Sequence, residues 1–502
     1  MLLALTALGV ISVLELLLWL PFIWRWRVGF TWLLIIGLTL ASVLLVVTHL
    51  GFWTALLFFF GSYRVINLFR VVAARTHVDY LLHAARQASL WLISLQLLTL
   101  GGELLTYHLQ LPAEAWLYGL AIGQVMSAGV IYASTKRHLR TTQLPVMLNR
   151  YADRDLPTLT VAIPARNETA DLEDCLRSLI SCDYPKLEIL VLDDCSQERR
   201  TSEIIRGFAH DGVRFIAGEV PPEQWLAKNY AYEQLRAASS GDVLMFCGVD
   251  VRFSPDTLRN LVEILLQKKK SLLSIIPINQ LPRSSWELES LLVQPSRYAW
   301  ELALPRRWLN RPPVLSTCWL ITRQALMASG GFQAVTHSSS PESYFARQVA
   351  RRDDGYSFIQ SDSGIGLQCL KSLPEQRATA TRTRYPQLHR RPELTALVTL
   401  AELAILVAPF LVLVGGLATG NWLLGIFSGA ACVLQLVSYA RIVNITYRQS
   451  VRRGYGLLPF AAAYDIVLLN LSMWRYEFSQ VIWKDRNVCL PVMRAFPALP
   501  KV

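Results

Sequence analysis

The chain of 502 residues has little charge. Only 17% of its residues are Asp, Glu, Lys or Arg, whereas 53% are hydrophobic, which excludes an ordinary soluble multidomain protein. The net charge of +12 forms no basic stripe interleaved with aromatic residues, because Lys and Arg cluster beside the hydrophobic segments instead. A nucleic-acid-binding protein is therefore not predicted, and we expect no nucleic acid among the partners.

Two further patterns are missing. The eight cysteines form no CxxC pair and no metal-ligand spacing, so we expect buried, reduced thiols, among them Cys182, Cys247 and Cys318. No internal repeat relates the hydrophobic segments at the two ends of the chain, which argues against a transporter.

Long hydrophobic runs lie at both ends of the chain. Each is about long enough to cross a hydrocarbon core of roughly 30 Å as a helix. The first lacks a basic start and a small-residue cleavage site, so we expect a retained helix. Arg64 and Asp465 lie inside two runs, where a charge costs about 2.5–3.5 kcal/mol. The runs are 2–23, 30–50, 51–72, 88–107, 114–134, 394–417, 421–441 and 455–474.

The distribution of Lys and Arg sets the expected orientation, because cytoplasmic loops hold the basic excess. It places the N-terminus outside and the middle of the chain in the cytoplasm. We expect the membrane that holds the protein to be a bacterial plasma (inner) membrane. We predict about five transmembrane helices in 1–135, a cytoplasmic linker in 136–155, a cytoplasmic domain in 156–392, two or three transmembrane helices in 393–476 and a tail in 477–502.

Short β-rich runs alternate with stretches of helical length in the central segment. The runs are 159–164, 187–192, 213–217, 243–247 and 272–277, and the helical stretches are 170–182, 200–209, 228–238 and 255–268. Near-continuous apolar runs are typical of strands covered on both faces. The pattern predicts an α/β domain with a mostly parallel sheet and helices on both faces, inserted between the α-helical transmembrane regions.

Polar turns follow three of these runs. Ligands of such sheets lie beyond the carboxyl ends of the strands, so these turns are expected to meet at one edge. They are Pro164, Ala165, Arg166, Asn167 and Glu168 after the first run, Asp193 and Asp194 after the second, and Gly248, Val249 and Asp250 after the fourth.

Four motifs in this order carry a resemblance. TVAIPARNE, LEILVLDDCS, WLAKNYA and GDVLMFCGVDVRFSPDTL resemble the donor half of family 2 glycosyltransferases of the GT-A type, the membrane-bound inverting enzymes. The resemblance covers roughly 156–260 well and 310–360 loosely. Residues 481–486 also look like the Trp-Lys-Gly-Arg tail of several membrane members.

The resemblance implies a nucleotide-sugar site. Asp193 and Asp194 would accept hydrogen bonds from the nucleoside, the turn 164–168 would face the base and diphosphate together with Val249, and Lys228 would approach the diphosphate. The residues alone leave other interpretations open. The acidic pair could lie in a solvated loop with Ser196 as a helix cap, Asn167 could cap the first helix, and Lys228 could be a surface lysine.

The metal site departs from the family pattern. Asp250 matches the second acid of an Asp-x-Asp motif, through which the family holds a divalent cation, Mg²⁺ or Mn²⁺, but Gly248 stands at the first. Asp250 is the expected metal ligand, and metal dependence stays open.

The catalytic base departs from it as well. Glu342 matches the base of the family's Glu-Asp pair, while Pro341 stands at its acidic neighbour. Without the resemblance, Glu342 would be an ordinary carboxylate in the first turn of a helix.

We therefore expect a membrane glycosyltransferase, a hexosyltransferase that moves a sugar from a nucleoside diphosphate sugar, a UDP-sugar, to a lipid or lipid-linked acceptor with inversion. The altered positions Gly248 and Pro341 leave open a catalytically impaired member that acts as a membrane binding or assembly partner. A polysaccharide synthase is a further alternative, although the Gln-x-x-Arg-Trp box of processive synthases is missing.

Overall fold

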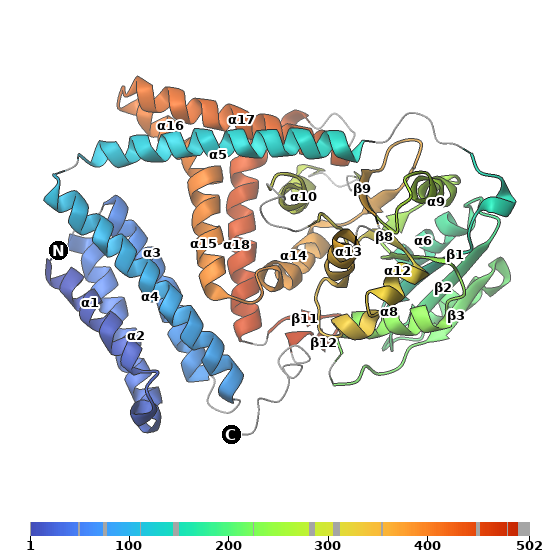
Figure 1. Ribbon diagram of the computed structural model, residues 1–502, viewed down its shortest axis with the longest axis horizontal. Helices are drawn as coiled ribbons and strands as arrows, with labels where there is room; N and C mark the ends of the chain where they lie inside the picture. Colours follow the sequence, from blue (N-terminus) through green and yellow to red (C-terminus); the bar gives the residue numbers. More distant parts are fainter. Residues whose placement is uncertain are drawn as a thin grey trace.

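The computed structural model describes residues 2–48, 51–73, 78–110, 112–143, 150–223, 225–280, 287–304, 312–352, 355–447, 452–478 and 480–489. Figure 1 shows helices from both ends of the chain beside an α/β domain made from its middle. The long helix α5 runs along one side of the molecule and leads from the N-terminal helices towards this domain.

Helices form nearly all of the two hydrophobic ends. The N-terminal helices are α1 (Leu2–Leu17), the 3₁₀ turn η1 (Pro21–Trp26), α2 (Arg27–Thr48), α3 (Phe52–Ala73), α4 (Val78–His108) and α5 (Ala113–Thr142). The C-terminal ones are α15 (Pro392–Glu402), the π-helical turn η6 (Leu403–Val407), α16 (Ala408–Ala418), α17 (Trp422–Tyr447), the 3₁₀ turn η7 (Arg452–Leu457) and α18 (Leu458–Glu477).

Seven helical stretches of the described residues are long and apolar enough to cross a membrane. They correspond to seven of the eight predicted runs. The first run instead forms α1, which has 16 residues and is shorter than a span. The division of the chain into membrane-spanning and cytoplasmic parts stays a prediction.

The two charges inside predicted spans are paired. Arg64 forms a fully buried ion pair of 2.6 Å with Glu15 and donates to Ser12 and Gln96. Asp465 pairs with Arg384 of helix α14 (Leu373–Gln387). Pairing offsets the cost of a charge among apolar helices, so both runs are compatible with burial in a helix bundle.

The central sheet has seven strands in the order β3-β2-β1-β4-β8-β6-β9. The strands are β1 (Leu159–Ala165), β2 (Leu187–Asp193), β3 (Val213–Ala217), β4 (Val243–Cys247), β6 (Leu272–Ile276), β8 (Cys318–Thr322) and β9 (Tyr356–Gln360). All pairs are parallel except those of β8, which runs antiparallel to β4 and β6. The mostly parallel sheet is confirmed, and the five predicted runs are five of its strands.

Two small sheets complete the strands. One has the order β5-β10-β7, formed by β5 (Val251–Arg252), β10 (Gln368–Leu370) and β7 (Ile278–Gln280). The other is a hairpin of β11 (Ile482–Trp483) and β12 (Arg486–Asn487), which follows α18.

Helices cover both faces of the central sheet. The α/β domain contains α6 (Ala170–Ile180), α7 (Arg200–Gly207), α8 (Ala227–Ala238), α9 (Thr257–Gln267), α10 (Gln294–Leu302), α12 (Arg323–Ala328), α13 (Pro341–Arg351) and α14 (Leu373–Gln387), with 3₁₀ turns at Asp153–Asp155, Ala209–Asp211, Glu287–Leu291 and Phe332–Val335.

Alternate side chains of β1 enter two separate core layers. Val161 and Ile163 pack with residues of α6 and α9, whereas Ala162 packs with residues of α8, α12 and α13. This alternation is the two-residue period of a strand buried on both faces.

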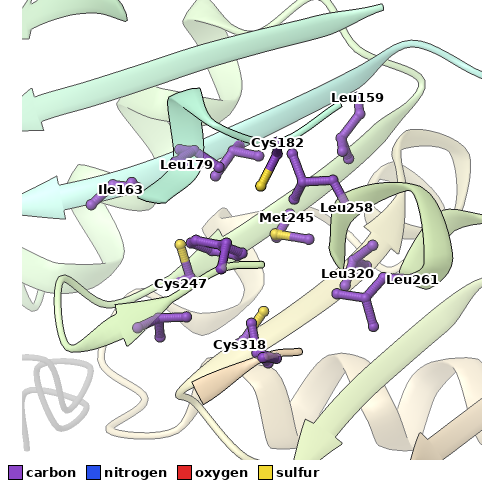
Figure 2. Close-up of a cluster of buried hydrophobic side chains, with 14 of the residues drawn as sticks. Leu159, Ile163, Leu179, Cys182, Met245, Cys247, Leu258, Leu261, Cys318 and Leu320 are labelled. Carbon is purple, nitrogen blue, oxygen red and sulfur yellow. The ribbon is translucent and has the colours of Figure 1, made fainter. Parts of the chain in front are cut away.

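The cysteines behave as the sequence predicts. All eight are free, and seven are buried. Figure 2 shows Cys182, Cys247 and Cys318 among the leucines of the α6 and α9 layer. Burial raises the pKa of the Cys247 and Cys318 thiols, which keeps them protonated and unreactive.

Candidate functional site

The turns after β1 and β2 are joined by hydrogen bonds. The backbone N–H of Asp194 donates to the Ala165 carbonyl at 2.7 Å, and that of Asn167 donates to the Ser196 hydroxyl at 2.9 Å. Asn167 has a φ of 49°, a left-handed conformation that Asn tolerates, and its side chain accepts from the Gln197 N–H. Neither Ser196 nor Asn167 caps a helix, since the residues preceding α6 and α7 are Thr169 and Arg199, so those two alternatives are wrong.

The two neighbouring aspartates play different parts. Asp193 accepts from the Ser196 N–H at 3.0 Å and so holds its own turn. Asp194 is buried and lines a cavity of about 230 Å³ at the carboxyl end of the sheet. Burial raises the pKa of its carboxyl group, while Arg486 and Arg166 act against this shift. Asp194 is thus the one of the pair that lines this cavity.

The C-terminal hairpin β11–β12 contacts the edge of this first cavity. Arg486 donates from one nitrogen to both carboxylate oxygens of Asp194 at 2.8 Å. Lys484 pairs with Glu168 and donates to the Arg166 carbonyl at 2.6 Å. Arg166 in turn donates to the Lys484 carbonyl at 3.0 Å. The hairpin therefore belongs to the site, a role that its resemblance to the family tail did not reveal.

Most of the predicted nucleotide-binding residues meet at the first cavity. Among the described residues that line it are Pro164, Ala165, Arg166, Glu168, Asp194, Lys228, Val249 and Asp250. Asn167 and Asp193 are not among them and instead stabilise the turns. The edge of the sheet therefore brings together three turns that the sequence places far apart.

Asp250 follows β4, and its carboxylate forms an ion pair with a lysine of the same chain. Its Oδ2 lies 3.0 Å from the Lys371 ammonium and accepts from the Cys369 thiol at 3.5 Å. Burial would raise the pKa of Asp250, but Lys371 outweighs it and the pKa is lowered. Asp250 therefore stays ionised as the partner of an ammonium group.

The predicted metal ligand is a single carboxylate that already forms an ion pair. Mg²⁺ and Mn²⁺ prefer several oxygen ligands, and a protein-built site uses carboxylates. No group of three or more His, Cys, Asp or Glu side chains that could hold a metal ion occurs within the described part of the chain. Position 248 offers no carboxylate, and Asp250 already faces Lys371. The residues present do not fit a divalent cation held by the protein.

Lys228 and Glu342 line a second, larger cavity of about 440 Å³. Lys228 lies at the start of α8, with its ammonium 5.3 Å from the centre of the Tyr232 ring. Burial lowers the pKa of Lys228, and Arg382, Arg297 and Lys371 lower it further, whereas Glu342 raises it. The ammonium thus lies among other cations.

Glu342 is buried in the first turn of α13, and its Oε2 has no hydrogen-bond partner among the described residues. Asn229 fixes the preceding loop, because its side chain donates to the carbonyls of Val335 at 2.6 Å and Ser338 at 2.8 Å. A buried carboxylate without a donor is costly, which is typical of groups kept for chemistry. Its place in the first turn also agrees with the alternative of an ordinary helix-opening carboxylate.

The two cavities share one wall. Lys228, Arg297, Ser316, Thr379, Arg382 and Trp483 line both. The Arg382 guanidinium stacks 4.7 Å from the Trp483 ring, and burial lowers its pKa to about 10. Two cations that line the first cavity, Arg297 and Lys371, were not singled out in the sequence, whereas Trp483 belongs to the tail motif. The arrangement suits an anion placed between the two cavities.

Sequence comparison agrees with the motifs. The model of the family described as "Glycosyl transferase family 2" matches residues 160–330. A probable glycosyltransferase, YdaM, of Bacillus subtilis (strain 168) is 31% identical over 126 residues, which are 24% of this chain and 29% of the relative. Glycosyltransferase AglE of Haloferax volcanii is 36% identical over 99 residues, 19% of this chain and 31% of the relative. The chain thus spans less than a third of the length of these relatives.

Among solved structures, the mannosyltransferase PcManGT of Pyrobaculum calidifontis, in complex with GDP-Man and Mn²⁺, is 20% identical with a TM-score of 0.44, over 71% of this chain and 99% of that one. The family match and the motifs show that residues 160–330 are similar to a family 2 glycosyltransferase domain.

Proposed function

We propose that the whole chain is a membrane glycosyltransferase that transfers a sugar from a nucleoside diphosphate sugar to a lipid or lipid-linked hydroxyl, with inversion. The observation that carries this proposal is the shared wall of the two cavities. Cations line it, Asp250 lies on the first-cavity side, and Glu342, whose Oε2 has no hydrogen-bond partner among the described residues, lies in the second cavity.

The first cavity is the proposed donor site. Asp194 would accept hydrogen bonds from the nucleoside, with the turn after β1 beside it. Lys228 would meet the diphosphate, because an ammonium favours phosphate oxygens. A uridine nucleotide, hence a UDP-sugar, is the proposed donor. A divalent cation was also expected from the sequence; among the described residues its expected ligand Asp250 forms an ion pair with Lys371.

The second cavity is the proposed acceptor site. There Glu342 would take the proton from the acceptor hydroxyl as its oxygen forms a bond to the anomeric carbon. The bond between that carbon and the diphosphate oxygen breaks at the same time, and the nucleoside diphosphate leaves with the electron pair. Attack from the side opposite the leaving group inverts the anomeric centre. Lys228 would balance the charge on the leaving group.

A third cavity supports a lipid acceptor. It has about 500 Å³ and lies among α5, α10, α15, η6, α17 and α18, most of which belong to candidate membrane spans. Its lining is mainly apolar, and Trp300 lines both this cavity and the second one. A hydrocarbon chain fits such a site, and its polar end would then reach Glu342. We propose that the α/β domain lies on the cytoplasmic side of a bacterial inner membrane.

A second candidate is a catalytically impaired relative that binds nucleotide and serves as an assembly partner. Pro341 beside the proposed base and Gly248 beside Asp250 favour it. Such a protein would bind a nucleoside diphosphate and transfer nothing.

Sugar transfer tests the proposal. The purified full chain in vesicles of native lipid is incubated with a panel of labelled nucleoside diphosphate sugars, and label is followed into the lipid phase. Label in lipid that depends on one donor supports the enzyme. No transfer from any donor, with nucleoside diphosphate binding intact, contradicts it and supports the impaired relative.

A further inference from the structure

Gly248 leaves room that the Asp250 side chain occupies. A Cβ atom at position 248 would lie 2.4 Å from Oδ1 of Asp250, closer than two such atoms approach. The carboxylate of Asp250 thus lies over the glycine. A second acid at position 248 would have to displace it, so the two-carboxylate arrangement implied by the family resemblance is incompatible with the present position of Asp250.

The backbone fixes Lys371 beside this carboxylate. Strand β10 pairs with β5, with Cys369 opposite Val251, and the Leu370 N–H donates to the Asp250 carbonyl at 2.9 Å. On its other side, Lys371 precedes Ser372, which caps α14 together with Glu375. A strand and a helix cap therefore hold position 371 on either side.

The side chain of Lys371 is also held in place. It is 18% exposed, it lines the first cavity, and its ammonium lies 3.0 Å from Asp250 Oδ2. The ordered backbone on both sides and the ion pair already restrict the rotamers of Lys371, so the side chain loses less conformational entropy on binding a ligand. Lys371 is therefore preorganised for an anion in this cavity.

The charge balance of the site is preserved. A divalent cation between two carboxylates gives a net charge of zero, and so does one ammonium beside one carboxylate. The pair of Lys371 and Asp250 therefore presents the donor diphosphate with the same net charge as a divalent cation held between two carboxylates. A second carboxylate beside Asp250 and Lys371 would make this net charge negative, and a divalent cation beside them would make it positive.

Other cations surround the same space. Arg297 and Arg382 line the first cavity along with Lys228 and Lys371. Arg297 is oriented by its hydrogen bond of 3.0 Å to the Ser316 hydroxyl. The lining also contains Arg166, Lys484 and five carboxylates, and Lys228, Arg297, Lys371 and Arg382 are the cations that we assign to the diphosphate.

We propose that Lys371, positioned by Asp250, binds the diphosphate of the donor in the place of a divalent cation, so that donor binding and transfer need no metal. This inference rests on the proposed function. During transfer, the Lys371 ammonium donates a hydrogen bond to a phosphate oxygen and stabilises the negative charge that builds on the leaving diphosphate as the bond to the anomeric carbon breaks.

Nucleotide binding measured by calorimetry tests the inference apart from activity. UDP and GDP are titrated into the purified full chain in detergent, once with EDTA and once with Mn²⁺. We expect the Kd of the preferred nucleotide to change by less than about threefold between the two conditions. In Lys371→Met, which keeps the stem and loses the charge, we expect the Kd to rise at least tenfold. Lys269→Met, at an exposed position of the same domain, is the matched control.

Each outcome of the titrations supports or overturns the inference about Lys371. If EDTA abolishes nucleotide binding by the wild type and Mn²⁺ restores it, the inference is overturned. This test needs no variant, so it holds even if the Lys371→Met protein fails to fold. EDTA-resistant binding that Lys371→Met leaves unchanged overturns it as well. If the wild type binds neither nucleotide in either condition, the proposed function fails, and this inference fails with it.

Discussion

One nitrogen of the Arg486 guanidinium lies 2.8 Å from both carboxylate oxygens of Asp194, across 292 residues of sequence. A residue of the C-terminal hairpin thus holds the carboxylate that we assign to the nucleoside. Because Asp194 is buried, it depends on this partner for its ionised form. We therefore expect the hairpin and the donor site each to stabilise the folded conformation of the other.

The pair predicts a pH-dependent effect of Arg486→Met. The folded-state pKa of Asp194 is raised by burial, so ionisation of this group lowers stability as pH rises through that pKa. Without Arg486 the pKa rises further, and the unpaired carboxylate costs stability only where it is ionised. We expect the loss of melting temperature in Arg486→Met to be larger at pH 8 than at pH 5, measured by thermal unfolding of the full chain in detergent.

Asp194→Asn provides the control for that experiment. The double variant Arg486→Met with Asp194→Asn has no carboxylate to leave unpaired, so its melting temperature should not fall more at pH 8 than at pH 5. An equal loss in Arg486→Met at both pH values would show that Arg486 acts through packing alone.

The buried pair of Arg64 and Glu15 predicts a large effect on the helix bundle. Both side chains are fully buried, and removal of one partner leaves an uncompensated charge. We expect Arg64→Met to lower the free energy of unfolding by about 3–5 kcal/mol, and Arg64→Met with Glu15→Met to recover most of that loss. Arg86→Met, at an exposed position of α4, should change little. A double variant as unstable as the single one would contradict a role through charge pairing.

The third cavity predicts a selective effect on the lipid acceptor. Ala462 of α18 lines this cavity, whereas its neighbour Ala463 is exposed. Ala462→Leu fills part of the space, so the KM for the acceptor lipid in a nanodisc is expected to rise at least fivefold. The Kd of the nucleoside diphosphate should stay the same, and Ala463→Leu should change neither. An unchanged KM in Ala462→Leu would place the acceptor elsewhere.

The sequence predicts the parts of this fold that depend on local patterns. Near-continuous apolar runs mark the five strands 159–165, 187–193, 213–217, 243–247 and 272–276 because both faces of the sheet are covered. The antiparallel strand β8 was not predicted, since nothing in its own residues specifies which neighbours it pairs with or in which direction. Its placement depends on contacts across the whole domain.

The same contrast holds for the site. Asp194, Lys228 and Asp250 follow strands or open a helix within recognisable motifs, and these motifs indicate the cavity that they line. Lys371 is 121 residues from Asp250, and Arg486 is 292 residues from Asp194. An isolated Lys or Arg looks like any surface cation in a sequence, so only the folded chain reveals these partners. Gly248 showed in the sequence only that the first acid of the family motif is missing.

The central claim is that an acceptor proton passes to Glu342 while the donor lies against Lys228 and Lys371. The most direct measurement compares sugar transfer into lipid by the wild type, Glu342→Gln and the exposed control Glu203→Gln, with the Kd of the nucleoside diphosphate measured alongside. We predict that Glu342→Gln lowers kcat by about 100-fold or more, the contribution of a general base, while its Kd and the activity of Glu203→Gln stay within about twofold of the wild type. Transfer by Glu342→Gln at the wild-type rate would contradict the account.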